Sequence, residues 1–196
     1  ASFGDEPATN GIIDPGRKAA LEPDPARRLE RLRATVDVDR FVSMTALDCL
    51  MWNWDGYAMN RNNYRAFHDL ETGRLVFFPH GVDQMFWKPN GPILTGRSGL
   101  VAKALFETED GRRLYLQRFI ELRTNVFNGK AVTNRIAELR ARLRPAVATR
   151  GAGELAQFES AVNLFRNRIL ARARDVDQQL AGVKTMTHLG LNESQP

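Results

Sequence analysis

The chain has 196 residues, 43% of them hydrophobic, which suffices for one good core but makes two independent cores unlikely. Its formal net charge is +5, its single cysteine excludes an internal disulfide, and no apolar run approaches the ~20 residues that span a bilayer. We therefore expect one domain without a membrane span.

The first third of the chain predicts an irregular arm followed by two helices. Residues 1–23 are rich in glycine, proline and alanine without periodicity, so an arm without regular structure is expected. Asp24 and Pro25 then form a helix start, with Asp at the N-cap and Pro at the first helical position. Asp37 caps a second helix whose apolar residues wrap most of its circumference. This buried helix would support a loop that begins at Asn53.

The segment from Asp55 to Asp83 holds a carboxylate, an amide five residues later at Asn60, and a second carboxylate. Between them, runs 63–68 and 75–78 are aromatic and β-branched, which predicts a hairpin that brings Asp83 back towards Asp55. In protein kinases the catalytic Asp is likewise followed five positions later by a metal-binding Asn, and a metal-binding Asp comes further on. The order and spacing therefore predict a Mg²⁺-dependent phosphotransfer site.

The remainder of the chain predicts helices. From Ser98 onwards apolar residues recur at helical spacing. Pro145 and the glycines of 151–153 should separate a last long helix, and Gly182 should end it. Residues 183–196 are expected to form a flexible tail.

The positive charge comes mainly from arginines along these C-terminal helices. They alternate with leucine and isoleucine at helical spacing, which is typical of a solvated surface opposite a buried stripe. Binding of nucleic acid would favour arginines on one face with interleaved aromatic residues. Nucleic acid is therefore not expected as a partner, whereas an acidic peptide or a nucleotide fits the charge equally well.

The residues around the two carboxylates resemble the core of the CotH family of atypical, secreted or spore-coat protein kinases. The resemblance is carried by Trp54-Asp-Gly-Tyr57, Asn62-Asn-Tyr-Arg65, His68-Asp69, Thr72-Gly-Arg74 and Phe78-Pro-His-Gly-Val-Asp-Gln-Met-Phe86. In weaker form it covers residues 24–182. It implies an α+β, mainly α fold: a helical domain like the C-terminal lobe of a kinase, with a short hairpin carrying the active-site residues.

The resemblance implies a role for each site residue. Asp55 would be the catalytic carboxylate and Asp83 a metal ligand, with Asn60 or Asn63 as the amide ligand. Mg²⁺ and ATP would be the cofactors, the acceptor a Ser or Thr of a protein substrate, and the location extracytoplasmic or secreted. Many relatives carry a further carboxylate where this chain has Gly81, so the resemblance supports a first metal ion more strongly than a second.

The chain departs from the family upstream of the motif. The nucleotide-binding half, with a basic residue on a strand that anchors the phosphates, normally precedes this region in the family. Here about fifty residues precede Asp55, and they hold neither a strand pair nor a Gly-rich loop. We therefore expect activity to require a second chain or a further N-terminal segment.

Two other functions remain open. The fold could serve as a catalytically inactive structural or binding subunit of a larger assembly. Alternatively, His68, His80 and Asp83 could hold a transition metal in a metal-dependent hydrolase, if the strands aligned them. Asp55 and the asparagines are also residue types that form turns.

Overall fold

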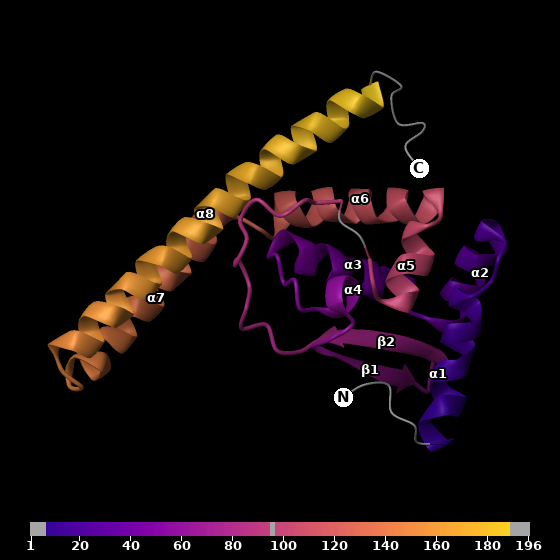
Figure 1. The fold of residues 1–196 in the computed structure, drawn as a ribbon, viewed down its shortest axis with the longest axis horizontal. Helices are drawn as coiled ribbons and strands as arrows, with labels where there is room; N and C mark the ends of the chain where they lie inside the picture. The colour runs from indigo at the N-terminus through magenta and orange to yellow at the C-terminus, as the bar shows by residue number, and fades with distance from the viewer. Residues whose placement is uncertain (1–6, 95–96, 189–196) are drawn as a thin grey trace. The chain divides into compact units, whose positions relative to one another are not determined.

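The computed structural model describes residues 7–94 and 97–188 and confirms a mainly helical α+β fold (Figure 1). Its elements are α1 (Pro7–Ala20), α2 (Pro25–Thr35), α3 (Val38–Leu50), α4 (Tyr57–Asn60), β1 (Tyr64–Asp69), β2 (Arg74–Pro79), α5 (Leu100–Phe106), α6 (Glu109–Asn125), α7 (Gly129–Ala148) and α8 (Ala152–His188). Within the described ranges, every helix is too short or too polar to cross a bilayer.

The chain divides into two compact units, each with its own set of internal contacts. Among the described residues, one unit comprises 7–85, 94 and 97–122, and the other comprises 86–93 and 123–188. The periodicity of a helix shows which of its faces is buried but not which neighbour covers that face. The sequence therefore could not show that residues 86–93 leave one unit and join the other.

The prediction of an irregular N-terminal arm is wrong for residues 7–20, which form helix α1. Residues 1–6 lie outside the described part. The helix packs beside α2 and α5, and its last residues, Ala19 and Ala20, are buried. Gly16 allows close packing, because a Cβ atom there would lie 2.9 Å from Leu75 Cδ1. Tertiary packing thus stabilises a helix whose own glycine and proline content disfavours it.

The predicted starts of α2 and α3 are confirmed. The Asp24 side chain accepts a hydrogen bond from the Ala26 N–H at 2.9 Å, and Pro25 begins α2. Asp37 caps α3 by accepting from the Arg40 N–H at 3.1 Å. Helix α3 is buried along most of its length, as predicted.

The predicted hairpin is also confirmed. Strands β1 and β2 are antiparallel, with Tyr64 opposite Pro79 and Asp69 opposite Arg74, and Gly73 takes the positive φ of 67° that its turn requires. The inner face of the hairpin packs on α3, where the rings of Phe41 and Phe77 lie 5.1 Å apart. The hairpin is therefore fixed to the helix that precedes the candidate site.

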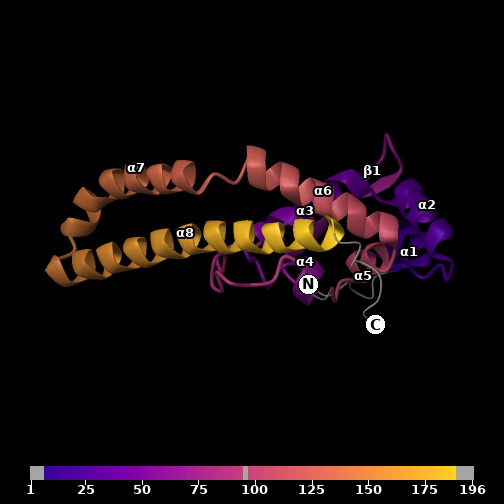
Figure 2. The ribbon, with the colours of Figure 1, turned by 90° about the horizontal axis from the view of Figure 1, so that it is seen from above.

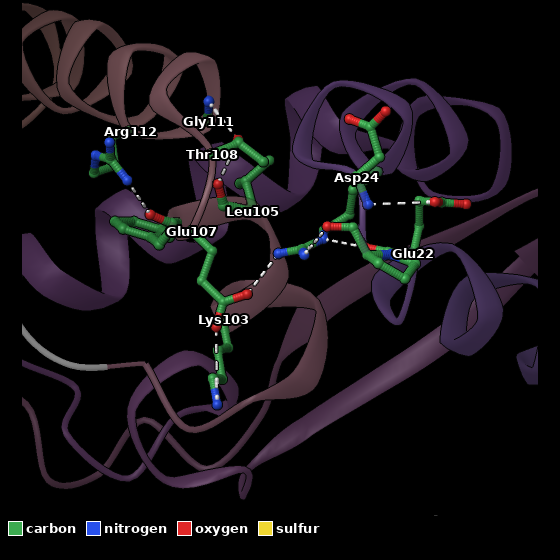
Figure 3. A network of polar contacts seen from close by, with 11 residues as sticks. Glu22, Asp24, Lys103, Leu105, Glu107, Thr108, Gly111 and Arg112 are labelled. Atoms are coloured by element: carbon green, nitrogen blue, oxygen red, sulfur yellow. Dashed lines mark hydrogen bonds and ion pairs between the residues drawn. The ribbon is translucent and has the colours of Figure 1, made fainter.

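Polar contacts join α2 to α5 and order the start of α6 (Figure 3). Arg28 donates to the Glu107 carboxylate at 2.5 Å and to the Glu22 carbonyl at 2.6 Å. The Thr108 hydroxyl accepts from the Gly111 N–H at 2.9 Å, which satisfies one of the open donors at the start of α6.

In the second unit, α7 and α8 run side by side (Figure 2) and are joined by a turn at Gly151, whose φ is 115°. Pro145 lies inside α7 and does not separate it from α8, and α8 continues past Gly182 to His188. Both corrections have a physical reason. A proline removes one helical hydrogen bond without forcing a stop, and a glycine permits a helix end but does not impose one. The predicted tail therefore begins with helix; residues 189–196 lie outside the described part.

Segment 86–93 is held against α8 by buried polar groups. Arg172, which is 0% exposed, donates to the carbonyls of Gly91 and of Pro89, the latter at 3.1 Å. The Gln179 side chain donates to Gly91 O at 3.0 Å and accepts from Ile93 N–H at 2.8 Å. These bonds satisfy backbone groups that would otherwise be buried without partners.

Candidate active site

The turn that carries Asp55 follows directly from the end of α3. It is closed by a hydrogen bond from the Gly56 N–H to the Asn53 carbonyl at 3.0 Å. Three of the four non-glycine residues with positive φ in the described chain lie here: Trp52, Arg61 and Asn63. Such backbone conformations cost free energy and persist only where the surrounding structure enforces them, often at functional sites.

Three amide side chains surround the Asp55 carboxylate. Asn60 Nδ2 donates to Oδ1 at 2.5 Å, whereas Asn62 Nδ2 and Asn63 Nδ2 donate to Oδ2 at 3.0 and 2.7 Å. An ionised carboxylate only accepts hydrogen bonds, so each amide must turn its nitrogen towards it. The predicted neighbours Asn60 and Asn63 are therefore assembled around Asp55. Asn62 was not among the predicted site residues, although it belongs to the same asparagine-rich run.

Asn63 connects Asp55 to the segment that leads to Asp83. Its carbonyl accepts from the His80 N–H at 2.9 Å. Gly81 packs against the same residue, since a Cβ atom there would lie 2.9 Å from Asn63 Oδ1. The hairpin thus returns the chain to the Asp55 cluster at His80 and Gly81. Asp83 follows two residues later and is exposed.

Aromatic rings form the support beneath the hairpin. The ring centroids of Tyr57 lie 4.6 Å from Tyr64 and 5.0 Å from Phe77. Burial raises the pKa of Tyr57, and burial together with the neighbouring Tyr57 raises the pKa of Tyr64 to about 12. Both phenols are therefore neutral at physiological pH, and the Tyr57 hydroxyl accepts from the Val101 N–H at 3.1 Å.

A buried carboxyl group that the sequence analysis did not identify lies under the turn. Asp48 is 2% exposed and accepts from Asn53 Nδ2 at 2.9 Å. Burial raises the pKa of Asp48 to about 6, although the hydrogen bond from Asn53 and the charge of Arg97 oppose that rise. The available signal in the sequence was an Asp on the buried helix, five residues before an Asn.

The predicted transition-metal set is not assembled. His68 pairs with Leu75 near the turn of the hairpin, whereas His80 follows Pro79 at its open end. His80 lies five positions beyond Leu75, which at ~3.4 Å per residue corresponds to roughly 17 Å. No three His, Cys, Asp or Glu residues of the described chain form a metal-binding group. The prediction of a metal site from His68, His80 and Asp83 is therefore wrong.

Comparison with known protein families shows a match over most of the chain. Residues 19–175 match the CotH family, described as CotH kinase protein. The chain belongs to this family. No curated protein matches the sequence. Membership of CotH indicates a kinase-like function at the level of the family, for which a nucleotide, a metal ion and a protein substrate are the general requirements.

Proposed function

We propose that the Asp55 site transfers a phosphoryl group from Mg²⁺·ATP to a Ser or Thr hydroxyl of a protein substrate. The observation that carries the proposal is the convergence of three amide donors on one carboxylate, at the end of a buried helix, in a member of a kinase family. Phosphoryl transfer depends mainly on positioning and on electrostatic stabilisation. A carboxylate held by several donors meets the first requirement.

Asp55 is the catalytic carboxylate in this proposal. It accepts a hydrogen bond from the substrate hydroxyl and takes its proton as the hydroxyl oxygen bonds to the γ-phosphorus, while the bond from that phosphorus to the bridging oxygen breaks and ADP leaves. The amides of Asn60, Asn62 and Asn63 fix the rotamer of the carboxylate, so that an oxygen faces the acceptor without reorganisation. Asp55 is only partly buried, which leaves room for a substrate hydroxyl to approach.

The donor chemistry of the site fits Mg²⁺. Because Asn60 and Asn63 turn their amide nitrogens towards Asp55, their carbonyl oxygens are available as hard ligands. The exposed carboxylate of Asp83 supplies the charged ligand that Mg²⁺ usually takes together with substrate phosphates. When bound, the ion would neutralise charge on the phosphates. Gly81 offers no side-chain oxygen, so the proposal includes one metal ion.

The proposal also includes a nucleotide anchor from a second chain or a further segment. In protein kinases a strand lysine holds the phosphates and a Gly-rich loop covers them. The described strands form one hairpin, and its Arg65 and Arg74 are exposed. Kinase assays should therefore use the complete protein, with any chain that co-purifies with it.

Substitution of Asp55 by Asn tests the proposal. We expect Asp55→Asn to bind Mg²⁺·ATP with unchanged affinity but to transfer phosphate ~10²–10⁴-fold more slowly, because the carboxylate acts on the acceptor and not on the nucleotide. Glu71→Gln is the matched control: it removes one exposed carboxylate from the turn of the same hairpin. Radiolabelled phosphate transfer and calorimetric titration with Mg²⁺·ATP measure the two effects.

Two results would contradict the proposal. If Asp55→Asn transferred phosphate as fast as Glu71→Gln, Asp55 would have no catalytic role and would serve only to form the turn. A wild-type protein that neither binds Mg²⁺·ATP nor transfers phosphate would favour the alternative of an inactive binding subunit.

A further inference from the structure

We propose that Asp48 and Asn53 are positioning residues that hold the Asp55 turn in its working geometry from beneath. The inference rests on the proposed role of Asp55. It concerns a second set of contacts, which lies on the buried side of the turn. Neither residue is exposed to a substrate: Asp48 is 2% and Asn53 0% exposed. They act through Asp55 and not on the reacting atoms.

Two hydrogen bonds tie the start of the turn to α3. The Asn53 N–H donates to the Asp48 carbonyl at 2.7 Å, and Asn53 Nδ2 donates to Asp48 Oδ1 at 2.9 Å. The backbone bond fixes where the turn begins. The side-chain bond fixes the rotation of Asn53, whose carbonyl in turn accepts the Gly56 N–H that closes the turn.

The Asp48–Asn53 pair also reaches the residue after Asp55. A Cβ atom on Gly56 would lie 2.7 Å from Asp48 Oδ2 and 3.2 Å from Asn53 Nδ2. Glycine is therefore required where the backbone passes directly over the pair, although its φ of −78° suits any residue. Asp55 thus lies inside a turn that contacts Asp48 on one side and the three asparagine amides on the other.

The pair is costly for stability, which favours a positioning role over a purely structural one. A carboxyl group that is almost fully buried resists ionisation, as the raised pKa of Asp48 indicates. Asn53 Oδ1 is buried and has no hydrogen-bond partner among the described residues. Such a group costs about 1–3 kcal/mol. An apolar pair of similar volume would avoid both costs but would not orient the turn.

Two variants in the full protein test the inference. Asn53→Ala deletes the side-chain bond and keeps the backbone bond. The double variant Asp48→Asn with Asn53→Asp reverses donor and acceptor and keeps one amide and one carboxyl group. Thr45→Val is the matched control, because it alters a buried hydroxyl on α3 that has no partner among the described residues.

We expect kcat for phosphate transfer to fall at least tenfold in Asn53→Ala, with KM for ATP within twofold of wild type. The kcat of the reversed pair should lie within threefold of the wild-type value, and the kcat of Thr45→Val should match that of wild type. Circular dichroism at the assay temperature establishes that each variant is folded. If Asn53→Ala fails to fold, the reversed pair decides alone: a folded, active reversed pair supports the inference, and a folded, inactive one overturns it.

Hydrogen–deuterium exchange separates this inference from the proposed function. Amides of residues 53–60 should exchange faster in Asn53→Ala than in wild type, while α8 exchanges at the same rate. An inactive wild type with this exchange pattern would refute the kinase proposal and leave the Asp48–Asn53 contact intact. The inference would be overturned if residues 53–60 of a folded Asn53→Ala exchanged at the wild-type rate, or if its kcat were unchanged. It would also be overturned if Asn53→Ala lost affinity for ATP by the same factor as it lost kcat.

Discussion

The buried carboxyl group of Asp48 predicts a specific dependence of stability on pH. Its pKa is about 6 in the folded protein, against an ordinary value of 3.8. Between these pH values the folded state therefore binds more protons than the unfolded state. The contribution of Asp48 to stability is fully present below about pH 4, is lost as the pH rises to about 6, and stays lost above that.

The size of the effect follows from the shift. One pKa unit corresponds to 1.36 kcal/mol, so a rise of about two units lowers the free energy of unfolding by about 3 kcal/mol between pH 4 and pH 7. Asp48→Asn keeps an acceptor for the Asn53 amide and cannot ionise. We therefore expect the advantage of Asp48→Asn over wild type to be about 3 kcal/mol larger at pH 7 than at pH 4.

Urea unfolding, followed by tryptophan fluorescence at several pH values and constant ionic strength, measures this difference. Glu30→Gln, which removes an exposed carboxylate in the middle of α2, is the control and should run parallel to wild type. A difference between wild type and Asp48→Asn that stays constant within about 1 kcal/mol from pH 4 to pH 8 would refute the reasoning, since a carboxyl group that titrates normally contributes no such change.

Three further substitutions have defined expected outcomes. Asp83→Asn should weaken Mg²⁺-dependent ATP binding at least tenfold in calorimetric titration while the protein stays folded; unchanged affinity would remove Asp83 from the metal site. Gly81→Ala should slow phosphate transfer, because its φ of 61° is strained for alanine and the new Cβ atom displaces Asn63; wild-type kcat would contradict this. Arg172→Met should lower the free energy of unfolding in urea by about 2–5 kcal/mol, since it removes the charged hydrogen bonds to the Pro89 and Gly91 carbonyls and leaves Gly91 with Gln179 alone, whereas Arg166→Met on the exposed side of α8 should cost less than about 0.5 kcal/mol.

The elements that the sequence predicted correctly depend on local chemistry. A helix cap such as Asp24 or Asp37 is satisfied within three residues, and the hairpin turn at Gly73 is set by one backbone angle. These signals are complete within a few positions of the chain. They do not depend on which element packs where, and this explains their agreement with the structure.

The errors concern features that depend on distant parts of the chain. Helix α1 packs through Gly16 against Leu75, which lies 59 positions further on, and no periodicity within residues 1–23 could show this. Arg172 is buried because it bonds Gly91, 81 positions earlier, whereas its place among other arginines predicted a solvated surface.

The Asp55 cluster belongs to the first class of features, because the hydrogen bonds to its carboxylate all come from residues 60–63. Asp48 to Asn53, Asp55 to Asn60 and Asp55 to Asn63 are separations of five, five and eight residues, and the hairpin needs only the register of two short strands to return His80 to Asn63. The sequence could therefore locate the Asp55 cluster, whereas Asp48 was not among the predicted site residues, because its role depends on burial and on the bond to Asn53.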